Sequence, residues 1–194
     1  MRNKFNISDL PSAELLRREL QRENYRKKFA RAMKSTFFTL VVVAAIAVLV
    51  STIWMPVLQI YGSSMSPTLN EGEIVVAVKG DNFVTGDLVS FYIGNKLLVK
   101  RYIAGPGQWV EIDESGNVFV DGKVLNEPYL TEKSLGDCNI EFPYQVPDNR
   151  IFCMGDHRAT SLDSRNTAVG CIADEQVVGK IVFCIWPFSA FGGV

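Results

Sequence analysis

The sequence predicts a mainly β domain preceded by one N-terminal transmembrane helix. The first observation is an uncharged apolar segment, residues 37–54, which as a helix would reach about 27 Å and so nearly cross a bilayer. The second is a change of pattern after Pro56, where short β-branched and aromatic runs alternate with turn signals. The 138 residues that follow Pro56 are enough for a single all-β domain with its own core.

Residues 1–36 form a basic segment that we expect to be helical and cytoplasmic. This segment holds ten Lys or Arg and four Asp or Glu, a net charge of +6, whereas the rest of the chain carries −7. By the positive-inside rule the amino end stays in the cytoplasm and the β domain lies outside. A charged helix is expected over residues 13–33, with Ser12 as its cap. The expected parts are the basic segment 1–36, the anchor 37–55 and the extracytoplasmic domain 56–194.

A cleaved secretory signal would explain the same apolar segment. However, the basic part is long for a signal peptide, the apolar part exceeds a usual h-region, and no well-placed small-x-small site follows it. We therefore predict an uncleaved anchor with a single crossing, and Trp54 at the membrane interface.

Seven segments of the exported part are predicted to be strands because they are rich in β-branched and aromatic residues. They are residues 73–78, 88–93, 97–104, 109–112, 117–120, 151–154 and 177–185. Short turn sequences separate several of them. Gly94-Asn95 is typical of a two-residue type II′ hairpin, Asp121-Gly122 of a type I′ hairpin, and Ser115-Gly116 marks another tight connection.

A serine and a lysine are the candidate catalytic residues. Ser64 follows the anchor closely, and Lys100 lies within an apolar strand-like run. A serine hydroxyl needs a base, and a lysine can serve when apolar neighbours lower its pKa from about 10.4 towards neutrality. The sequence contains a single histidine, His157, so a histidine base would have to be that residue. Taken alone, neither residue requires catalysis: Ser64 could be an ordinary turn residue, and Lys100 could point from its strand into the solvent.

A third segment, residues 155–165, places two Asp, two Arg and two Ser in one loop directly after an apolar run. A solvated turn would account for charges of both signs so close together. Directional hydrogen-bonding groups on a loop that leaves a strand are also how a site is held rigid. The loop is therefore a candidate support for the serine and the lysine.

These segments, with one more, resemble in the same order the sequence boxes of the bacterial type I signal peptidases. Members of this Ser/Lys leader peptidase family are membrane-bound endopeptidases that remove signal peptides from exported proteins. The matching segments are residues 64–69, 86–89, 100–107 and 155–158 with 161–165. The resemblance implies a signal-peptidase-like β domain and a serine endopeptidase that cleaves preproteins after small-x-small motifs.

The resemblance also implies a role for each matching residue. Ser64 would be the nucleophile, and Lys100 the general base that later protonates the leaving amine. Ser161 would hydrogen-bond the lysine ammonium and orient it, as the carboxylate orients the histidine of a triad. For three further residues we expect a structural role in bracing the loop: Asp156, Asp163 and Arg165.

The oxyanion is expected to meet the backbone N–H of Ser64, with a second donor near Gly62. Removing one such donor typically costs about 10²- to 10³-fold in rate. Some members of the family have a serine where this chain has Gly62, so here the second donor must be backbone or water. In the last box, this chain has His157 where the family frequently has asparagine and Ala159 where it frequently has aspartate. We therefore expect His157 to be a loop residue and not a catalytic base.

Apolar residues beside the expected dyad are predicted to line shallow pockets for small side chains at the first and third positions before the cut. They are Ile60, Met65, Leu98 and Val99. Core packing would explain these residues nearly as well. The expected partners are signal peptides of exported preproteins and the lipid bilayer of the plasma membrane. A position near the secretion translocon is compatible with this, and binding to nucleic acid is not expected.

All four cysteines fall in the expected exported domain: Cys138, Cys153, Cys171 and Cys184. There is no CxxC spacing and only one histidine, so neither a zinc site nor another metal or cofactor is expected. An oxidising compartment permits two disulfides in any of three pairings. Cys153 and Cys184, however, lie in apolar strand-like runs that are typical of buried free thiols.

Two other functions fit parts of the sequence. A LexA-like Ser/Lys autoprotease shares the dyad chemistry, but it would carry a DNA-binding region in place of the membrane span. An anchored β-domain that binds exported proteins without cutting them would require Ser64 and Lys100 to be structural.

Overall fold

One long helix precedes the β structure in the computed structural model, which describes residues 12–194; the predictions for residues 1–11 lie outside the described part. Helix α1, Ala13–Trp54, takes in both the expected charged helix and the apolar segment. The Ser12 hydroxyl accepts a hydrogen bond from the Leu15 N–H at 3.4 Å, as expected of the cap. The helix contains neither Gly nor Pro and ends shortly before Pro56, which disfavours helical geometry in the residue before it.

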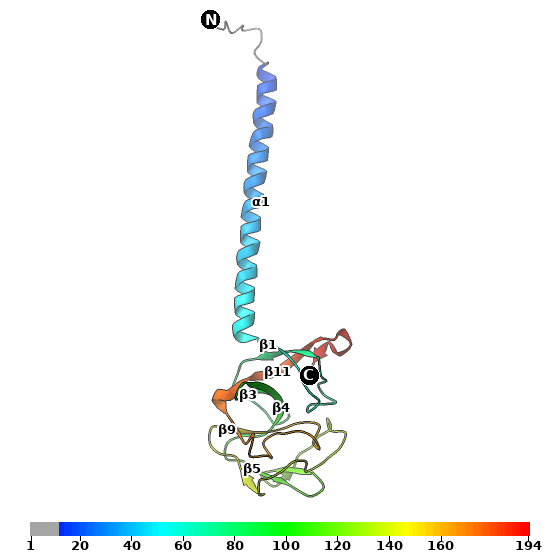
Figure 1. Cartoon of the computed structure of the whole chain (residues 1–194). Helices are drawn as coiled ribbons and strands as arrows, with labels where there is room; N and C mark the ends of the chain where they lie inside the picture. Colours follow the sequence, from blue (N-terminus) through cyan, green and yellow to red (C-terminus); the bar gives the residue numbers. More distant parts are fainter. Residues whose placement is uncertain (1–11) are drawn as a thin grey trace. The chain divides into compact units, whose positions relative to one another are not determined.

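The chain divides into two compact units between residues 50 and 51. The second unit is built around an antiparallel sheet whose strand order is β1-β2-β11-β3-β4-β9-β10, with β12 paired to β11 (Figure 1). Its strands are β1 Val57–Gln59, β2 Ile74–Val78, β3 Leu88–Ile93, β4 Lys96–Ala104, β9 Arg150–Met154, β10 Ile172–Ala173, β11 Val177–Trp186 and β12 Gly192–Gly193. Two short 3₁₀ turns, η2 Asp174–Gln176 and η3 Phe188–Ala190, flank β11.

A smaller antiparallel sheet has the order β7-β6-β5-β8. Its strands are β5 Trp109–Ile112, β6 Val118–Val120, β7 Lys123–Val124 and β8 Tyr144–Gln145. In Figure 1 the strand β5 of this sheet lies at one end of the β unit and β1 at the other. Buried residues of β4, β5, β6 and β9, among them Ile103, Val110, Val118 and Phe152, form one apolar cluster across the two sheets.

Two further clusters of buried side chains lie within the large sheet. One packs Ile60, Met65 and Leu69 of the segment after β1 against Val75, Ala77, Leu88, Ile181 and Cys184. The other joins Val89, Phe91, Tyr102, Ile151, Cys153 and Ile172. The first cluster fixes the segment that carries Ser64, since both Ile60 and Met65 are buried on either side of it.

The expected fold class is confirmed, and all seven predicted strands are present with ends shifted by no more than one residue. Both two-residue hairpins also occur: Ile93 pairs with Lys96 around Gly94, and Val120 pairs with Lys123. Asp121 and Gly122 both have positive φ, 51° and 74°, as a type I′ turn requires. The strands that were not predicted, β1, β7, β8, β10 and β12, are only two or three residues long.

Candidate active site

Ser64 and Lys100 meet in the structure although 36 residues separate them. Ser64 lies in a turn after β1, and Lys100 lies on β4, opposite Val89 of β3. Lys100 Nζ is 2.7 Å from Ser64 Oγ, which is hydrogen-bonding distance. The two residues therefore have the separation that proton transfer between hydroxyl and amine requires.

Burial changes the chemistry of Lys100, which is 2% exposed. Loss of hydration lowers the pKa of its amine from the ordinary 10.5 to about 8, because a buried site disfavours the charged form. The Asp163 carboxylate opposes this shift in the Lys100 pKa, and the Arg165 guanidinium adds to it. A neutral amine is thus accessible at mildly alkaline pH.

Asp163 and Arg165 form a fully buried ion pair within the 155–165 loop. Arg165 Nε donates to Asp163 Oδ1 and Arg165 Nη2 to Oδ2, both at 2.8 Å. Burial alone would raise the pKa of Asp163, but the adjacent guanidinium holds it below its usual range. The same carboxylate accepts the Gly155 N–H at 2.9 Å, so the pair ties the beginning of the loop to its end.

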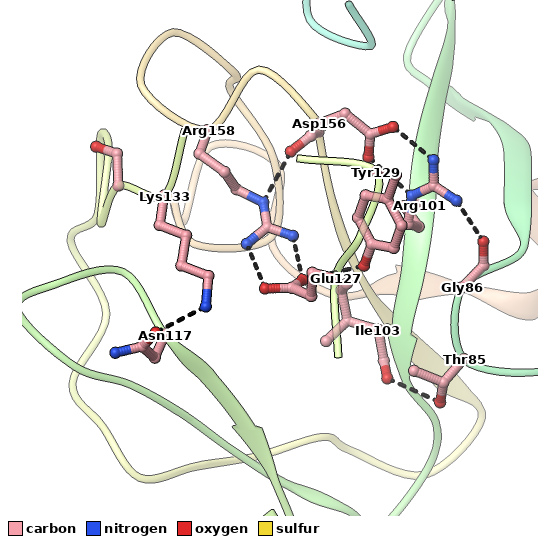
Figure 2. Close-up of polar contacts among 12 residues, drawn as sticks. Thr85, Gly86, Arg101, Ile103, Asn117, Glu127, Tyr129, Lys133, Asp156 and Arg158 are labelled. Carbon is pink, nitrogen blue, oxygen red and sulfur yellow. Dashed lines mark hydrogen bonds and ion pairs between the residues drawn. The ribbon is translucent and has the colours of Figure 1, made fainter. Parts of the chain in front are cut away.

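Asp156 joins the loop to the strand that carries Lys100. Arg101 Nε donates to Asp156 Oδ1 at 2.8 Å and Arg101 Nη2 to Oδ2 at 2.5 Å, a bidentate pair with both side chains buried. Thr68 Oγ1 donates to the same carboxylate at 2.5 Å. Arg101 Nη1 also donates to the Gly86 carbonyl at 2.6 Å (Figure 2). One carboxylate thereby connects β4, the Ser64 segment and the loop.

The loop touches the Ser64 segment directly through its backbone. The His157 N–H donates to the Ser64 carbonyl at 3.0 Å, while the His157 ring bonds to the Thr160 hydroxyl at 2.6 Å. A Cβ at Gly155 would lie 2.6 Å from the Ser64 carbonyl oxygen and would also clash with Ser161 Oγ. Only glycine at 155 allows the loop to approach this closely.

Ser161 belongs to the 155–165 loop, and we predict that its hydroxyl bonds to the Lys100 ammonium. Ser161 is fully buried, and among residues 12–194 its Oγ lies close to the Asp163 carboxylate and makes no hydrogen bond to Lys100. The hydroxyl lies near Gly155, which is held by Asp163. The structure contains no hydrogen bond between Ser161 and Lys100, so orientation of the Lys100 ammonium by Ser161 stays a prediction.

The expected oxyanion donors lie on an open turn. Gly62 has φ of 79°, a left-handed conformation that a side chain would strain, so glycine suits this position. Within residues 12–194 the backbone N–H of Ser64 donates to no acceptor. That N–H therefore has no competing acceptor in the part of the chain that the structure describes.

The four predicted pocket residues surround a small cavity beside Ser64. Ile60, Met65, Leu98 and Val99 line it together with Gln59, Tyr61, Ser64 and Leu97. The cavity is small, with a volume of about 30 Å³, and Ser64 forms part of its wall. Three of the lining residues were not predicted, because Gln59, Tyr61 and Leu97 carry no chemical signal in the sequence.

Three polar residues near the site were missed as partners. Arg101 follows Lys100 in the sequence and Thr68 belongs to the Ser64 segment, but their common bond to Asp156 depends on sheet register. Glu127 forms a buried ion pair with Arg158. In the sequence Glu127 lies in a turn-rich stretch, where a charge is normally solvated.

The four cysteines are free thiols, and all but Cys138 are buried. Burial raises the pKa of the Cys153 thiol well above its ordinary value, so this residue is an inert neighbour of Lys100. Among residues 12–194, no group of three or more His, Cys, Asp or Glu side chains has an arrangement that fits a metal ion.

Comparison with known proteins assigns the family. The sequence profile of the family described as "Signal peptidase, peptidase S26" matches residues 33–186, most of the chain. The chain belongs to the signal peptidase family, peptidase S26. This confirms the resemblance found in the sequence, and it places the chain among the enzymes of the signal peptidase I type.

Individual members of this family are similar over most of their length. The "Signal peptidase I" of Bacillus amyloliquefaciens is 35% identical over 162 residues, which are 77% of this chain and 83% of the relative. The "Signal peptidase IB" of Staphylococcus aureus strain COL is 37% identical over 153 residues, 68% of this chain and 78% of the relative. A crystal structure of a signal peptidase I from Enterococcus faecalis V583 has a TM-score of 0.42 and 23% identity, and covers 52% of this chain and 97% of that chain.

Family membership removes the support for the two other functions considered from the sequence, a LexA-like autoprotease and a binding domain without catalysis. Helix α1 is long and apolar enough to cross a membrane by length and composition. Together with the family, this helix indicates a membrane-anchored protein.

Proposed function

We propose that this chain is a membrane-anchored serine endopeptidase that cleaves signal peptides from exported preproteins, using Ser64 and Lys100 as a dyad. The observation that supports it is the 2.7 Å contact between Lys100 Nζ and Ser64 Oγ, made by a buried amine whose pKa falls to about 8. A hydroxyl beside a neutral amine is a nucleophile with its base already in place.

The reaction follows from this pair. The neutral Lys100 amine takes the Ser64 proton as Ser64 Oγ attacks the scissile carbonyl carbon, and the oxyanion is received by the Ser64 N–H with a second backbone donor near Gly62. The Lys100 ammonium then protonates the leaving amide nitrogen as the peptide bond breaks. Water attacks the acyl-enzyme in the same way, with Lys100 again accepting and returning the proton. Ser161 orients the ammonium in this scheme.

The cavity beside Ser64 supports cleavage after small-x-small motifs. The cavity is small, and apolar side chains on β4 and in the Ser64 segment form part of its wall beside Ser64 itself. In this proposal Ile60, Met65, Leu98 and Val99 contact the small residues at the first and third positions before the cut.

The charge distribution supports the orientation. The basic residues 1–36 remain in the cytoplasm, residues 37–55 cross the plasma membrane once, and residues 56–194 form the extracytoplasmic catalytic domain. Signal peptides are bound where they leave the lipid, near the secretion translocon. Digestion of this domain by a protease added to intact spheroplasts, with residues 1–36 protected, tests the orientation.

The dyad is tested with full-length protein in detergent and a labelled preprotein that ends its signal peptide in Ala-x-Ala. Cleavage mapped by mass spectrometry is expected for the parent chain and lost, by at least about 10³-fold, in Ser64→Ala and in Lys100→Met. Matched controls are Ser63→Ala, on the neighbouring serine, and Lys96→Met, on an exposed lysine of the same strand; both are expected to cleave. Undiminished cleavage by Ser64→Ala would refute the assignment.

A further inference from the structure

The segment between β7 and β8, residues 125–143, contains no helix or strand but packs against the 155–165 loop at two points. We call it the bracing segment. Near its start, the Glu127 carboxylate pairs with the Arg158 guanidinium. Further along, Arg165 Nη1 donates to the Leu135 carbonyl at 2.7 Å. The loop is therefore held from outside as well as by its own Asp163–Arg165 pair.

Glu127 is the buried charge of this segment. Its side chain and that of Arg158 both have no exposed surface. Arg158 donates through Nη2 to Glu127 Oε1 and through Nη1 to Glu127 Oε2, the latter at 3.2 Å (Figure 2). A carboxylate buried this completely is tolerated only with its partners in place, so the position of Arg158 follows that of Glu127.

Tyr129 extends the same contact towards β4. Its hydroxyl donates to Glu127 Oε1 at 3.0 Å, and its ring lies under the Arg101 guanidinium at 3.7 Å from the centroid. Figure 2 shows this ring between Glu127 and Arg101. Arg101 is the neighbour of Lys100 on β4 and the bidentate partner of Asp156. Two residues of the bracing segment thus reach both the loop and the lysine strand.

Arg158, which pairs with Glu127, is bonded to the part of the loop that lies against Ser64. Arg158 Nε donates to the Gly155 carbonyl at 3.0 Å, and Gly155 approaches the Ser64 carbonyl too closely to admit a Cβ. Two residues later, the His157 N–H donates to that same Ser64 carbonyl at 3.0 Å. If Arg158 moved, Gly155 would move with it and displace the Ser64 backbone, because no flexible side chain lies between Gly155 and Ser64.

We infer that Glu127, through Arg158 and Tyr129, is a positioning residue that sets the distance between Ser64 Oγ and Lys100 Nζ. The inference rests on the proposed roles of Ser64 and Lys100. Neither Glu127 nor Tyr129 touches the reacting atoms; both act on the turnover step by fixing the loop against the Ser64 segment. A misplacement of reacting groups by about 1 Å costs roughly 10²-fold in rate.

Glu127→Gln is the decisive substitution, since it keeps the shape of the side chain and removes the charge that holds Arg158. With full-length protein in detergent and the Ala-x-Ala preprotein, kcat is expected to fall about 10- to 100-fold, with KM within about twofold. Tyr129→Phe keeps the ring under Arg101 but loses the bond to Glu127, and is expected to lower kcat about 3- to 10-fold. Rates are expressed per folded molecule, measured by near-UV circular dichroism.

The pH profile separates positioning from stability alone. A loosened loop admits water to Lys100, which restores hydration of the ammonium, so the acid limb of kcat/KM is expected to move to higher pH in Glu127→Gln. Val110→Ala, a cavity variant in the apolar cluster between the sheets, is the control for general destabilisation. It is expected to leave kcat per folded molecule and the acid limb unchanged.

Parental kcat per folded molecule and an unmoved acid limb in Glu127→Gln would overturn the inference. If Glu127→Gln does not fold, the same reading applies to Tyr129→Phe, which retains the ion pair. Cleavage by Ser64→Ala would instead overturn the proposed dyad, whereas loss of cleavage in Ser64→Ala with full activity in Glu127→Gln would sink only the positioning role.

Discussion

Arg101, the residue next to Lys100 on β4, donates hydrogen bonds to both carboxylate oxygens of Asp156, at 2.8 and 2.5 Å. The pair is buried on both sides and joins the lysine strand to the loop whose backbone contacts Ser64. The two halves of the dyad are therefore coupled through a structural ion pair as well as through their own hydrogen bond.

Replacing Arg101 by lysine should break this coupling. Lysine offers one compact charge and cannot make the bidentate contact, the bond to the Gly86 carbonyl and the stacking on Tyr129 together. The free energy of unfolding is expected to fall by about 2 to 4 kcal/mol, because a buried carboxylate loses part of its pairing. Urea unfolding of the full-length protein in detergent measures this loss. Arg150→Lys, at an exposed arginine of β9, should change it by less than about 1 kcal/mol.

The rate of cleavage should depend on pH through Lys100. The base is the neutral amine, so kcat/KM is expected to rise about tenfold per pH unit up to pH about 8 and then to level off. The direction follows from burial, which lowers the pKa of Lys100 from 10.5. A series of initial rates between pH 6 and 10 on the Ala-x-Ala preprotein measures it. A level profile between pH 6 and 8 would argue against lysine as the base.

Lys100→Met should produce a more stable but inactive protein. The folded-state pKa of Lys100 lies below the unfolded one, so the unfolded chain binds more protons between pH 8 and 10.5 and stability rises with pH across that window. Below pH about 8 the full cost of charging the buried amine is present, about 3 kcal/mol. Methionine removes that cost. Unfolding curves at pH 7 should show the gain, and it should shrink as the pH approaches 10.5; an equal or lower stability at pH 7 would contradict the burial argument.

Gly155→Ala should damage catalysis through the backbone. The added methyl group would meet Ser161 Oγ and the Ser64 carbonyl oxygen, the latter at 2.6 Å, so the loop and the Ser64 segment must move apart. We expect kcat to fall by about 10²-fold and the free energy of unfolding by about 1 to 3 kcal/mol. Gly80→Ala is the matched control, since a Cβ there meets nothing within 4 Å. Parental activity in Gly155→Ala would mean that the contact is dispensable.

Much of the fold could be predicted because it is written in local patterns. The apolar segment, the seven predicted strands and the two-residue hairpins each depend on neighbouring residues alone. The strands that escaped prediction, such as β8 Tyr144–Gln145, are two or three residues long and owe their form to the strand beside them. At that length side-chain periodicity carries no signal, and pairing with a distant partner decides the conformation.

The sequence by itself determined the family, the anchor and the identity of the serine and lysine candidates, because these rest on residue types in a fixed order. Only the tertiary structure decided that Glu127 pairs with Arg158 and that Arg101 pairs with Asp156. The two pairs join residues 31 and 55 positions apart, and no local sequence pattern brings residues so far apart in the chain together. Burial of a charged residue such as Glu127 depends on tertiary packing, so the sequence alone does not distinguish it from a solvated charge.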